Sequence, residues 1–174
     1  EGGMRVPMIA RLPGKIPAGS VSSEVATMMD FLPTFCALGG AALPEARIDG
    51  HDISKLLFEE GSQSPYEAFY YYRRRQLQAV RMGEWKWHLP LDKTYPRWDN
   101  VTETGDGKPG KLIHLGKDLK ETTDVTDQHP EIIEKLKALV AKAEADLGNE
   151  DRPGKGQRPA FDLAESKPLL LKSE

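Results

Sequence analysis

The chain has 174 residues, of which 39% are hydrophobic and 29% are charged, a composition typical of globular proteins. Lys and Arg total 24 and Asp and Glu total 27, so the net charge of −3 gives no indication of nucleic acid or an anionic membrane as a partner. The single cysteine excludes an internal disulfide and a cysteine-based metal site, and no run approaches the roughly 20 apolar residues of a membrane-spanning helix.

The first element is a short apolar run at residues 6–10, closed by a Pro-Gly pair. It predicts a strand buried on both faces, as in a parallel sheet. Such a strand needs a neighbour on each side, and the residues that follow do not obviously supply them. Because the chain also opens on a Glu-Gly-Gly turn without an initiating Met, we expect it to be the C-terminal portion of a larger protein. The residues alone leave two roles open for Arg5, an anion contact and a structural partner of Glu1.

Two short helices are predicted in the rest of this first region. Asp30 is expected to cap a helix over residues 31–38, which a Gly-Gly pair then ends. A second helix is expected over residues 54–59, after an Asp-Gly turn. Residues 1–65 are therefore predicted to form one structural region.

The sequence that follows favours a small antiparallel sheet. Aromatic residues and alternating patterns predict strands at residues 69–72, 77–81 and 85–89, with a hairpin connection at 82–84. Residues 111–115 can supply a further strand.

The clearest predicted helix spans residues 130–147. A proline at its first position and glutamates in its first turn favour its start, and a Gly-Asn pair ends it. Its apolar residues recur at helical spacing and form one stripe, which should pack on the sheet. The sheet and this helix predict a subdomain over residues 66–150, followed by an extended surface tail over 151–174.

Little in the chain suggests a self-contained active site. No G-x-S-x-G elbow, Walker loop or glycine-rich dinucleotide motif occurs. The His51-Asp52 pair is too small for a metal coordination shell and is better explained as a polar loop that starts a helix. Residues 90–110 show no periodicity, and irregular segments of this length are often functional.

Several segments, taken in order along the chain, resemble arylsulfatase-type sulfatases of the alkaline phosphatase superfamily. They are E-G-G-M-R-V-P at 1–7, D-F-L-P-T at 30–34, D-G at 49–50, A-V-R-M-G-E-W-K at 79–86, L-I-H-L-G-K-D-L-K-E at 112–121 and G-Q-R-P at 156–159. In the family a Pro follows the residue that corresponds to Asp118, and an Asn lies a few residues beyond the one that corresponds to Glu121. Both the Pro and the Asn are replaced in this chain. Their shared order carries the resemblance, because no single segment is decisive.

The resemblance implies a sulfuric ester hydrolase. Members of this family hydrolyse sulfate esters with a formylglycine, made from Cys or Ser in a C/S-x-P-x-R motif, and with a calcium ion that helps to hold the sulfate. Cys36 is followed by Ala-Leu and does not match that motif. The resemblance therefore implies that formylglycine and calcium belong to an upstream part of the parent enzyme. This chain is expected to contain no catalytic residue and no metal ligand, and to be inactive alone.

The implied fold class is α+β for the isolated chain, with the last strand and helices of an α/β sulfatase core followed by a small antiparallel sheet packed on a C-terminal helix. Glu1 and Arg5 are expected to position neighbouring groups rather than touch the sulfate. The substrate would be a small-molecule or glycan sulfate ester, and the family resemblance implies a periplasmic, secreted or lysosomal location. The candidates for contacting substrate are His88, Lys93, Tyr95, Arg97 and Trp98.

Two alternatives remain open. The parent protein could be a phosphatase or phosphonate monoester hydrolase of the same superfamily, which an unmodified Thr or Ser nucleophile would favour. The chain could also be a non-catalytic module whose hairpin sheet and final helix bind a glycan or a protein partner.

Overall fold

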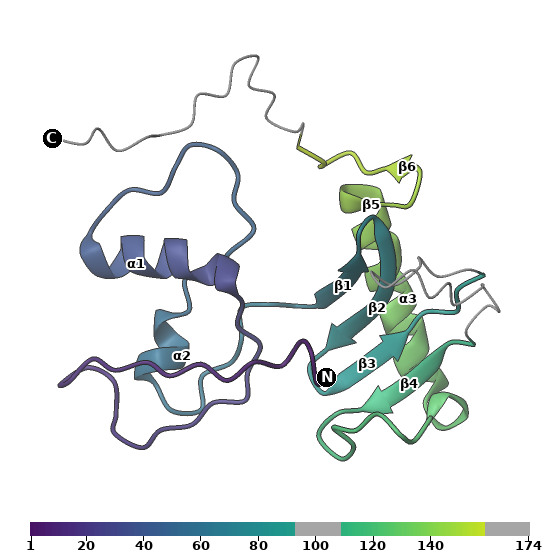
Figure 1. Ribbon diagram of the computed structural model, residues 1–174, viewed down its shortest axis with the longest axis horizontal. Helices are drawn as coiled ribbons and strands as arrows, with labels where there is room; N and C mark the ends of the chain where they lie inside the picture. Colours follow the sequence, from purple (N-terminus) through teal and green to yellow (C-terminus); the bar gives the residue numbers. More distant parts are fainter. Residues whose placement is uncertain (93–108, 159–174) are drawn as a thin grey trace, which may run out of the picture.

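The computed structural model describes residues 1–92 and 109–158. Its elements form two neighbouring groups (Figure 1). Short helices and long loops make up the first group, and a four-stranded sheet with one long helix makes up the second. No helix in these two ranges is long and apolar enough to cross a membrane.

The sheet is an antiparallel meander. Its strands are β1 (Phe69–Arg73), β2 (Gln76–Met82), β3 (Trp85–His88) and β4 (Lys111–His114), and they lie in the order β1-β2-β3-β4. The predicted strands and the tight connection between β2 and β3 are confirmed, with small shifts at the ends. Aromatic and alternating residues identified them because each strand has one face on a core and one face away from it.

The register between β1 and β2 contains a β-bulge. Tyr71 pairs with Ala79 whereas Tyr72 pairs with Leu77, so Gln78 is an extra residue on β2. An extra residue interrupts the alternation of side chains between the two faces of a sheet.

Helix α3 (Pro130–Leu147) covers one face of the sheet, as its apolar stripe predicted. Pro130 occupies the first turn, where its missing N–H costs no helical hydrogen bond. The buried residues of this core come from β2, β3, the loop after β3, β4 and α3, and they are Leu77, Val80, Trp87, Leu89, Leu112, Ile133, Leu136, Leu139 and Ala143.

The first group contains η1 (Met28–Asp30), α1 (Phe31–Gly39) and α2 (Ser54–Phe58). The two predicted helices are confirmed, and Gly40 ends α1 in the left-handed conformation with φ of 67°. Asp30 is the N-cap residue of α1, as predicted, but its side chain makes no capping hydrogen bond to this helix. Asp30 already belongs to η1, so its carboxylate completes a capping box with Thr27 instead.

Asp30 is fully buried and joins three segments. Its carboxylate accepts hydrogen bonds from the main-chain nitrogens of Thr27 (2.6 Å) and His51 (2.8 Å), and from the hydroxyl of Tyr66. Burial, and then the hydrogen bond to Asp30, raise the pKa of Tyr66 to about 12, so this hydroxyl remains a donor. Asp30 therefore organises the loops around η1.

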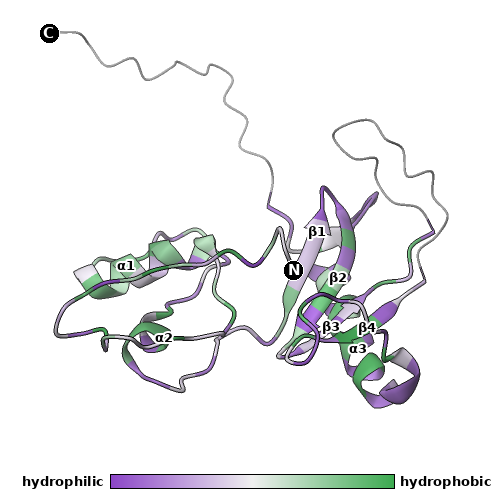
Figure 2. Ribbon diagram, turned by 60° about the horizontal axis from the view of Figure 1, so that its bottom comes forward, coloured by the Kyte–Doolittle hydropathy of each residue, from purple (hydrophilic) through white to green (hydrophobic). Residues whose placement is uncertain are grey.

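Residues 6–10 do not form the buried strand that their apolar sequence predicted. Val6 is 76% exposed and Ile9 is 94% exposed, and no strand is assigned there. A strand requires hydrogen bonds to a neighbouring strand, and no segment in the described ranges pairs with this one. Helix α1 also exposes apolar side chains, including Phe35 (65%), and it is largely hydrophobic in Figure 2.

The described part of the predicted surface tail folds back on α3. Strands β5 (Gly148–Asn149) and β6 (Arg152–Pro153) form a small hairpin after the helix. The next residues donate to carbonyls of the last helical turn, with Lys155 N to Ala145 O at 2.9 Å and Gly156 N to Asp146 O at 2.8 Å. The segment 151–158 thus supplies hydrogen-bond donors to main-chain carbonyl oxygens at the C-terminal end of α3. The rest of the predicted tail, 159–174, lies outside the described residues.

Arg158 extends this contact to the first group of elements. Its guanidinium donates to the carbonyl oxygen of Arg47 at 2.6 Å and forms an ion pair with Asp49. Arg47 in turn lies 3.1 Å from the carboxylate of Asp146 on α3. The segment after α3 therefore connects the two groups.

Substitution of Gly50 by alanine is expected to lower the free energy of unfolding by about 1–3 kcal/mol. A Cβ at this position would lie 2.0 Å from the carbonyl oxygen of Met29, so the backbone beside Asp30 would have to move. Urea denaturation measures the change. Gly39→Ala is the matched control, because a Cβ there meets nothing within 4 Å and alanine favours the helix. Equal effects of the two substitutions would contradict the prediction.

Candidate functional site

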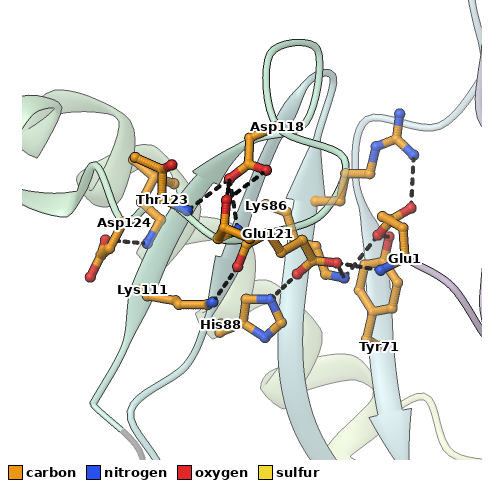
Figure 3. Close-up of polar contacts among 12 residues, drawn as sticks. Glu1, Tyr71, Lys86, His88, Lys111, Asp118, Glu121, Thr123 and Asp124 are labelled. Carbon is orange, nitrogen blue, oxygen red and sulfur yellow. Dashed lines mark hydrogen bonds and ion pairs between the residues drawn. The ribbon is translucent and has the colours of Figure 1, made fainter.

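A cluster of charged side chains lies on the face of the sheet opposite α3 (Figure 3). Trp85 and Trp87 of β3 pack toward the helix, so the alternating residues Lys86 and His88 point the other way. We call this group the Lys86 cluster. It consists of Glu1, Tyr71, Arg81, Lys86, His88 and Glu121.

Lys86 is the centre of the cluster, and its side chain is only 5% exposed. The ammonium nitrogen lies 2.8 Å from a carboxylate oxygen of Glu1 and 2.9 Å from one of Glu121. It also lies 4.5 Å from the centroid of the Tyr71 ring, a cation–π contact. Arg81 adds a second cation, 3.9 Å from Glu1. Two carboxylates thus meet two side-chain cations and the terminal ammonium of Glu1, which forms an ion pair with Glu121.

Glu121 reaches the sheet from the loop that follows β4. Its backbone is left-handed, with φ of 56°, a conformation uncommon for a residue other than glycine. The carboxylate of Asp118 accepts from the main-chain nitrogens of Thr122 and Thr123, each at 2.8 Å, and Lys111 donates to the carbonyl oxygen of Glu121 at 2.6 Å. These bonds hold the loop so that the Glu121 side chain turns onto the cluster (Figure 3).

Electrostatics keeps both carboxylates of the cluster ionised. Burial alone would raise the pKa of Glu121, but hydrogen bonds from the terminal ammonium of Glu1, from Lys86 and from His88 outweigh it and lower this pKa to about 2. The pKa of Glu1 is lowered as well, because Lys86 outweighs the opposing effect of burial. Burial lowers the pKa of His88 more than its contact with Glu121 raises it, which favours the neutral imidazole.

A pocket of about 330 Å³ opens beside the cluster. Strands β1, β2 and β3 and the segment after Glu1 form its walls. Its lining consists of Met4, Tyr71, Tyr72, Arg73, Gln78, Ala79, Lys86 and His88.

Only some of the site residues predicted from sequence belong to this site. Glu1 and His88 both belong to the Lys86 cluster. Arg5 is exposed, and its main-chain nitrogen bonds to the carbonyl of Glu1 at 2.9 Å. The other four candidates for substrate contact, Lys93, Tyr95, Arg97 and Trp98, lie outside the described residues. Contact between any of these residues and a substrate stays a prediction.

Sequence reasoning did not single out Lys86, Arg81, Tyr71 or Glu121 as site residues. A signal was present, because Glu1, Arg81, Lys86 and Glu121 are charged residues of three segments that carry the family resemblance. Within residues 1–92 and 109–158, no three His, Cys, Asp or Glu side chains gather in a way that could hold a metal ion.

Acidification is expected to weaken the fold through Glu121. Its folded-state pKa of about 2 lies below the ordinary value of 4.5, so its contribution is present above about pH 4.5 and is lost as the pH falls toward 2. The contribution should be on the order of 2 kcal/mol. Urea denaturation at a series of acidic pH values should show this slope in the wild type and a flatter one in Glu121→Gln. Glu59→Gln, at an exposed position, should keep the wild-type slope. An unchanged slope in Glu121→Gln would exclude this assignment.

Comparison with known proteins gives a consistent family assignment. Residues 64–160 match a family model described as the C-terminal region of aryl-sulfatase. The chain is 34% identical to arylsulfatase A of Homo sapiens, with 94% of this chain and 36% of that protein covered. It is 41% identical to an arylsulfatase of Hemicentrotus pulcherrimus, covering 63% of this chain and 20% of that one. The chain is also 44% identical to N-acetylgalactosamine-6-sulfatase of Canis lupus familiaris, covering 80% and 30%.

Solved structures agree with this assignment. A Bacteroides thetaiotaomicron protein, solved in work on the metabolism of multiple glycosaminoglycans, matches with a TM-score of 0.52 and 26% identity over 66% of this chain and 24% of that one. The PsFucS1 sulfatase from Pseudoalteromonas sp. matches with a TM-score of 0.57 and 24% identity over 75% and 28%, which supports the fold. The chain spans between 20% and 36% of the length of the three curated relatives described.

Proposed function

Because the chain belongs to the arylsulfatase family, over the C-terminal region of that family, we propose that it is part of an enzyme that hydrolyses sulfate esters. The match of residues 64–160 to the family model is the observation that carries the proposal. Since the chain spans at most 36% of the curated relatives described, the activity is proposed for a longer protein and not for these residues alone.

Within such an enzyme, the contribution of this chain would be structural support beside the sulfate site. The Lys86 cluster holds the Glu-Gly-Gly segment on the sheet through Glu1. It holds the loop after β4 on the sheet through Glu121. That arrangement fits the expectation that Glu1 positions neighbouring groups. For Arg5 the described contacts provide no comparable support.

Formylglycine and calcium remain expectations of family membership. When present, they would supply the nucleophile and neutralise charge on the transferring sulfate. The described residues offer no group of side chains suited to a metal ion, and Cys36, half-buried in α1, lacks the sequence of a formylglycine precursor. No step of the reaction is therefore assigned to either group within this chain.

We further propose a sulfated carbohydrate as the substrate class. The support is the identity with N-acetylgalactosamine-6-sulfatases of dog and mouse and the fold match to the Bacteroides protein studied for glycosaminoglycan metabolism. A steryl-sulfatase of Homo sapiens is also 44% identical over 51% of this chain, so a sterol sulfate is the competing class.

Hydrolysis of a chromogenic aryl sulfate tests the proposed reaction. The longer enzyme is expected to release the phenol from 4-nitrophenyl sulfate, and the isolated chain 1–174 should show no turnover. The matched probe is 4-nitrophenyl phosphate, which a phosphatase would prefer. Turnover of the phosphate without the sulfate by the longer enzyme, or turnover of the sulfate by the isolated chain, would contradict the proposal.

A further inference from the structure

The β-bulge on β2 shapes the pocket beside the Lys86 cluster. Because Gln78 is an extra residue, it and the adjacent Ala79 both line this pocket, although successive residues of a regular strand face opposite sides. Bulges of this kind redirect a side chain and are common beside functional sites. Ala79 pairs with His88 on β3. The small side chain of Ala79 leaves space between the amide of Gln78 and the imidazole of His88. The resulting volume of about 330 Å³ lies at the lower end of the range for small-molecule sites.

The contact with Glu121 fixes the hydrogen-bonding character of His88. The Nε2 atom lies 2.5 Å from a carboxylate oxygen of Glu121, and an ionised carboxylate can only accept, so Nε2 must carry the proton. In a neutral imidazole the other nitrogen, Nδ1, is then an acceptor. Figure 3 shows one ring nitrogen directed at Glu121 and the other directed away from it. The charged groups that act on this ring are Glu121, Lys86 and Lys111.

The cations around the pocket are already engaged. Lys86 is held by two carboxylates at 2.8 and 2.9 Å, and Arg73 makes an interaction of its own. An anion such as sulfate would also meet the lone pair of His88 Nδ1 and the charge of Glu121. A hydroxyl group would instead donate to Nδ1 and accept from the amide nitrogen of Gln78, which donates one of its two hydrogens to Gln76 at 2.9 Å and keeps the second.

We propose that this pocket binds an uncharged, hydroxyl-bearing part of the substrate, namely a sugar ring, and that Glu121 is the positioning residue that presents His88 Nδ1 as an acceptor to one of its hydroxyls. The inference rests on the proposed function for its substrate class. It assigns the sulfate to another part of the enzyme and the sugar to this face of the sheet.

Nuclear magnetic resonance titration of the chain 1–174 tests the pocket. The probes are the methyl glycosides of galactose and N-acetylgalactosamine, with sodium sulfate as the anion probe and sodium chloride as the ionic-strength control. The backbone amides of Gln78, Ala79 and His88 should shift saturably with a glycoside and should respond equally to the two salts. Long-range nitrogen–proton correlation should show the Nε2–H tautomer of His88.

The chain offers a matched pair of control variants. His114 and Glu84 form a similar histidine–carboxylate contact of 3.7 Å, and the His114 ring packs against Trp85 away from the pocket. His88→Gln and Glu121→Gln should weaken glycoside binding roughly threefold to tenfold, the effect of about one hydrogen bond. His114→Gln and Glu84→Gln should leave it unchanged. Only Glu121→Gln should alter the tautomer of His88, which a purely structural role would not predict. Should His88→Gln unfold, Met4→Ala at the exposed rim provides a second variant, also expected to weaken binding.

Three results would overturn the proposal: saturable shifts with sulfate but not with any glycoside, no shift with either glycoside, or an Nδ1–H tautomer of His88 in the wild type. These outcomes are separate from the test of the proposed function. Aryl sulfate turnover by the longer enzyme without glycoside binding here would reject only the pocket assignment. Glycoside binding by an enzyme without sulfatase activity would reject only the proposed reaction.

Discussion

Replacing Lys86 by methionine is expected to lower the free energy of unfolding by about 3–5 kcal/mol. Methionine fills similar space but leaves the carboxylates of Glu1 and Glu121 facing one another on a nearly buried surface. Removing one partner of a buried ion pair costs more than the pair contributes, because the remaining charges keep their desolvation penalty. Chemical denaturation of the purified variant at neutral pH measures the loss.

Two controls make this result specific to the cluster. Lys137→Met removes a lysine whose side chain is 54% exposed and pairs with Glu134 one helical turn away, so the expected loss is below about 0.5 kcal/mol. The double variant Lys86→Met with Glu121→Gln should recover part of the stability, because it also removes one of the uncompensated charges. A loss for Lys86→Met as small as that for Lys137→Met would show that the ion pairs contribute little.

Replacing Asp30 by alanine is expected to cost about 3 kcal/mol or more. The substitution removes the acceptor of three hydrogen bonds, from the main-chain nitrogens of Thr27 and His51 and from the hydroxyl of Tyr66. Each buried donor left without a partner costs about 1–3 kcal/mol. The loops around η1 should loosen while the sheet keeps its packing on α3, which amide hydrogen exchange would detect as lost protection confined to the first group of elements.

The control for Asp30 is Asp127→Ala, a substitution of an exposed aspartate in η2 (Thr126–Gln128). Its expected effect on the free energy of unfolding is within about 0.5 kcal/mol. A uniform loss of protection across the sheet in Asp30→Ala would contradict the view that this residue organises only the first group.

The fold of residues 66–150 was predictable because its signals are local. Alternation along β2 and β3 and the apolar stripe of α3 each reflect a face that the element itself must bury. Residues 6–10 gave an equally apolar signal, and yet Ile9 is 94% exposed. Apolar composition indicates that a segment needs a covering surface, but it does not show where that surface is.

The candidate site was harder to predict because its contacts are not local. Glu121 lies 35 residues from Lys86 in sequence, and Glu1 lies 85 residues from it. The pairing depends on the left-handed turn at Glu121 and on the Asp118 hydrogen bonds that hold it. Spacing along the chain carries no information about such a turn, so the shared family segments were the only available indication.

The position of Arg158 has a consequence for how the chain is made. Arg158 bonds to Arg47 and Asp49, residues that precede it by 111 and 109 positions. On a ribosome the first group of elements therefore leaves the exit tunnel well before Arg158, which bonds to it, is synthesised. During that interval the first group lacks the contacts that Arg158 makes with Arg47 and Asp49, so it is more open to chaperones and to other nascent chains. Codon choice that slows translation between residues 50 and 158 would lengthen this vulnerable interval, and a faster stretch would shorten it.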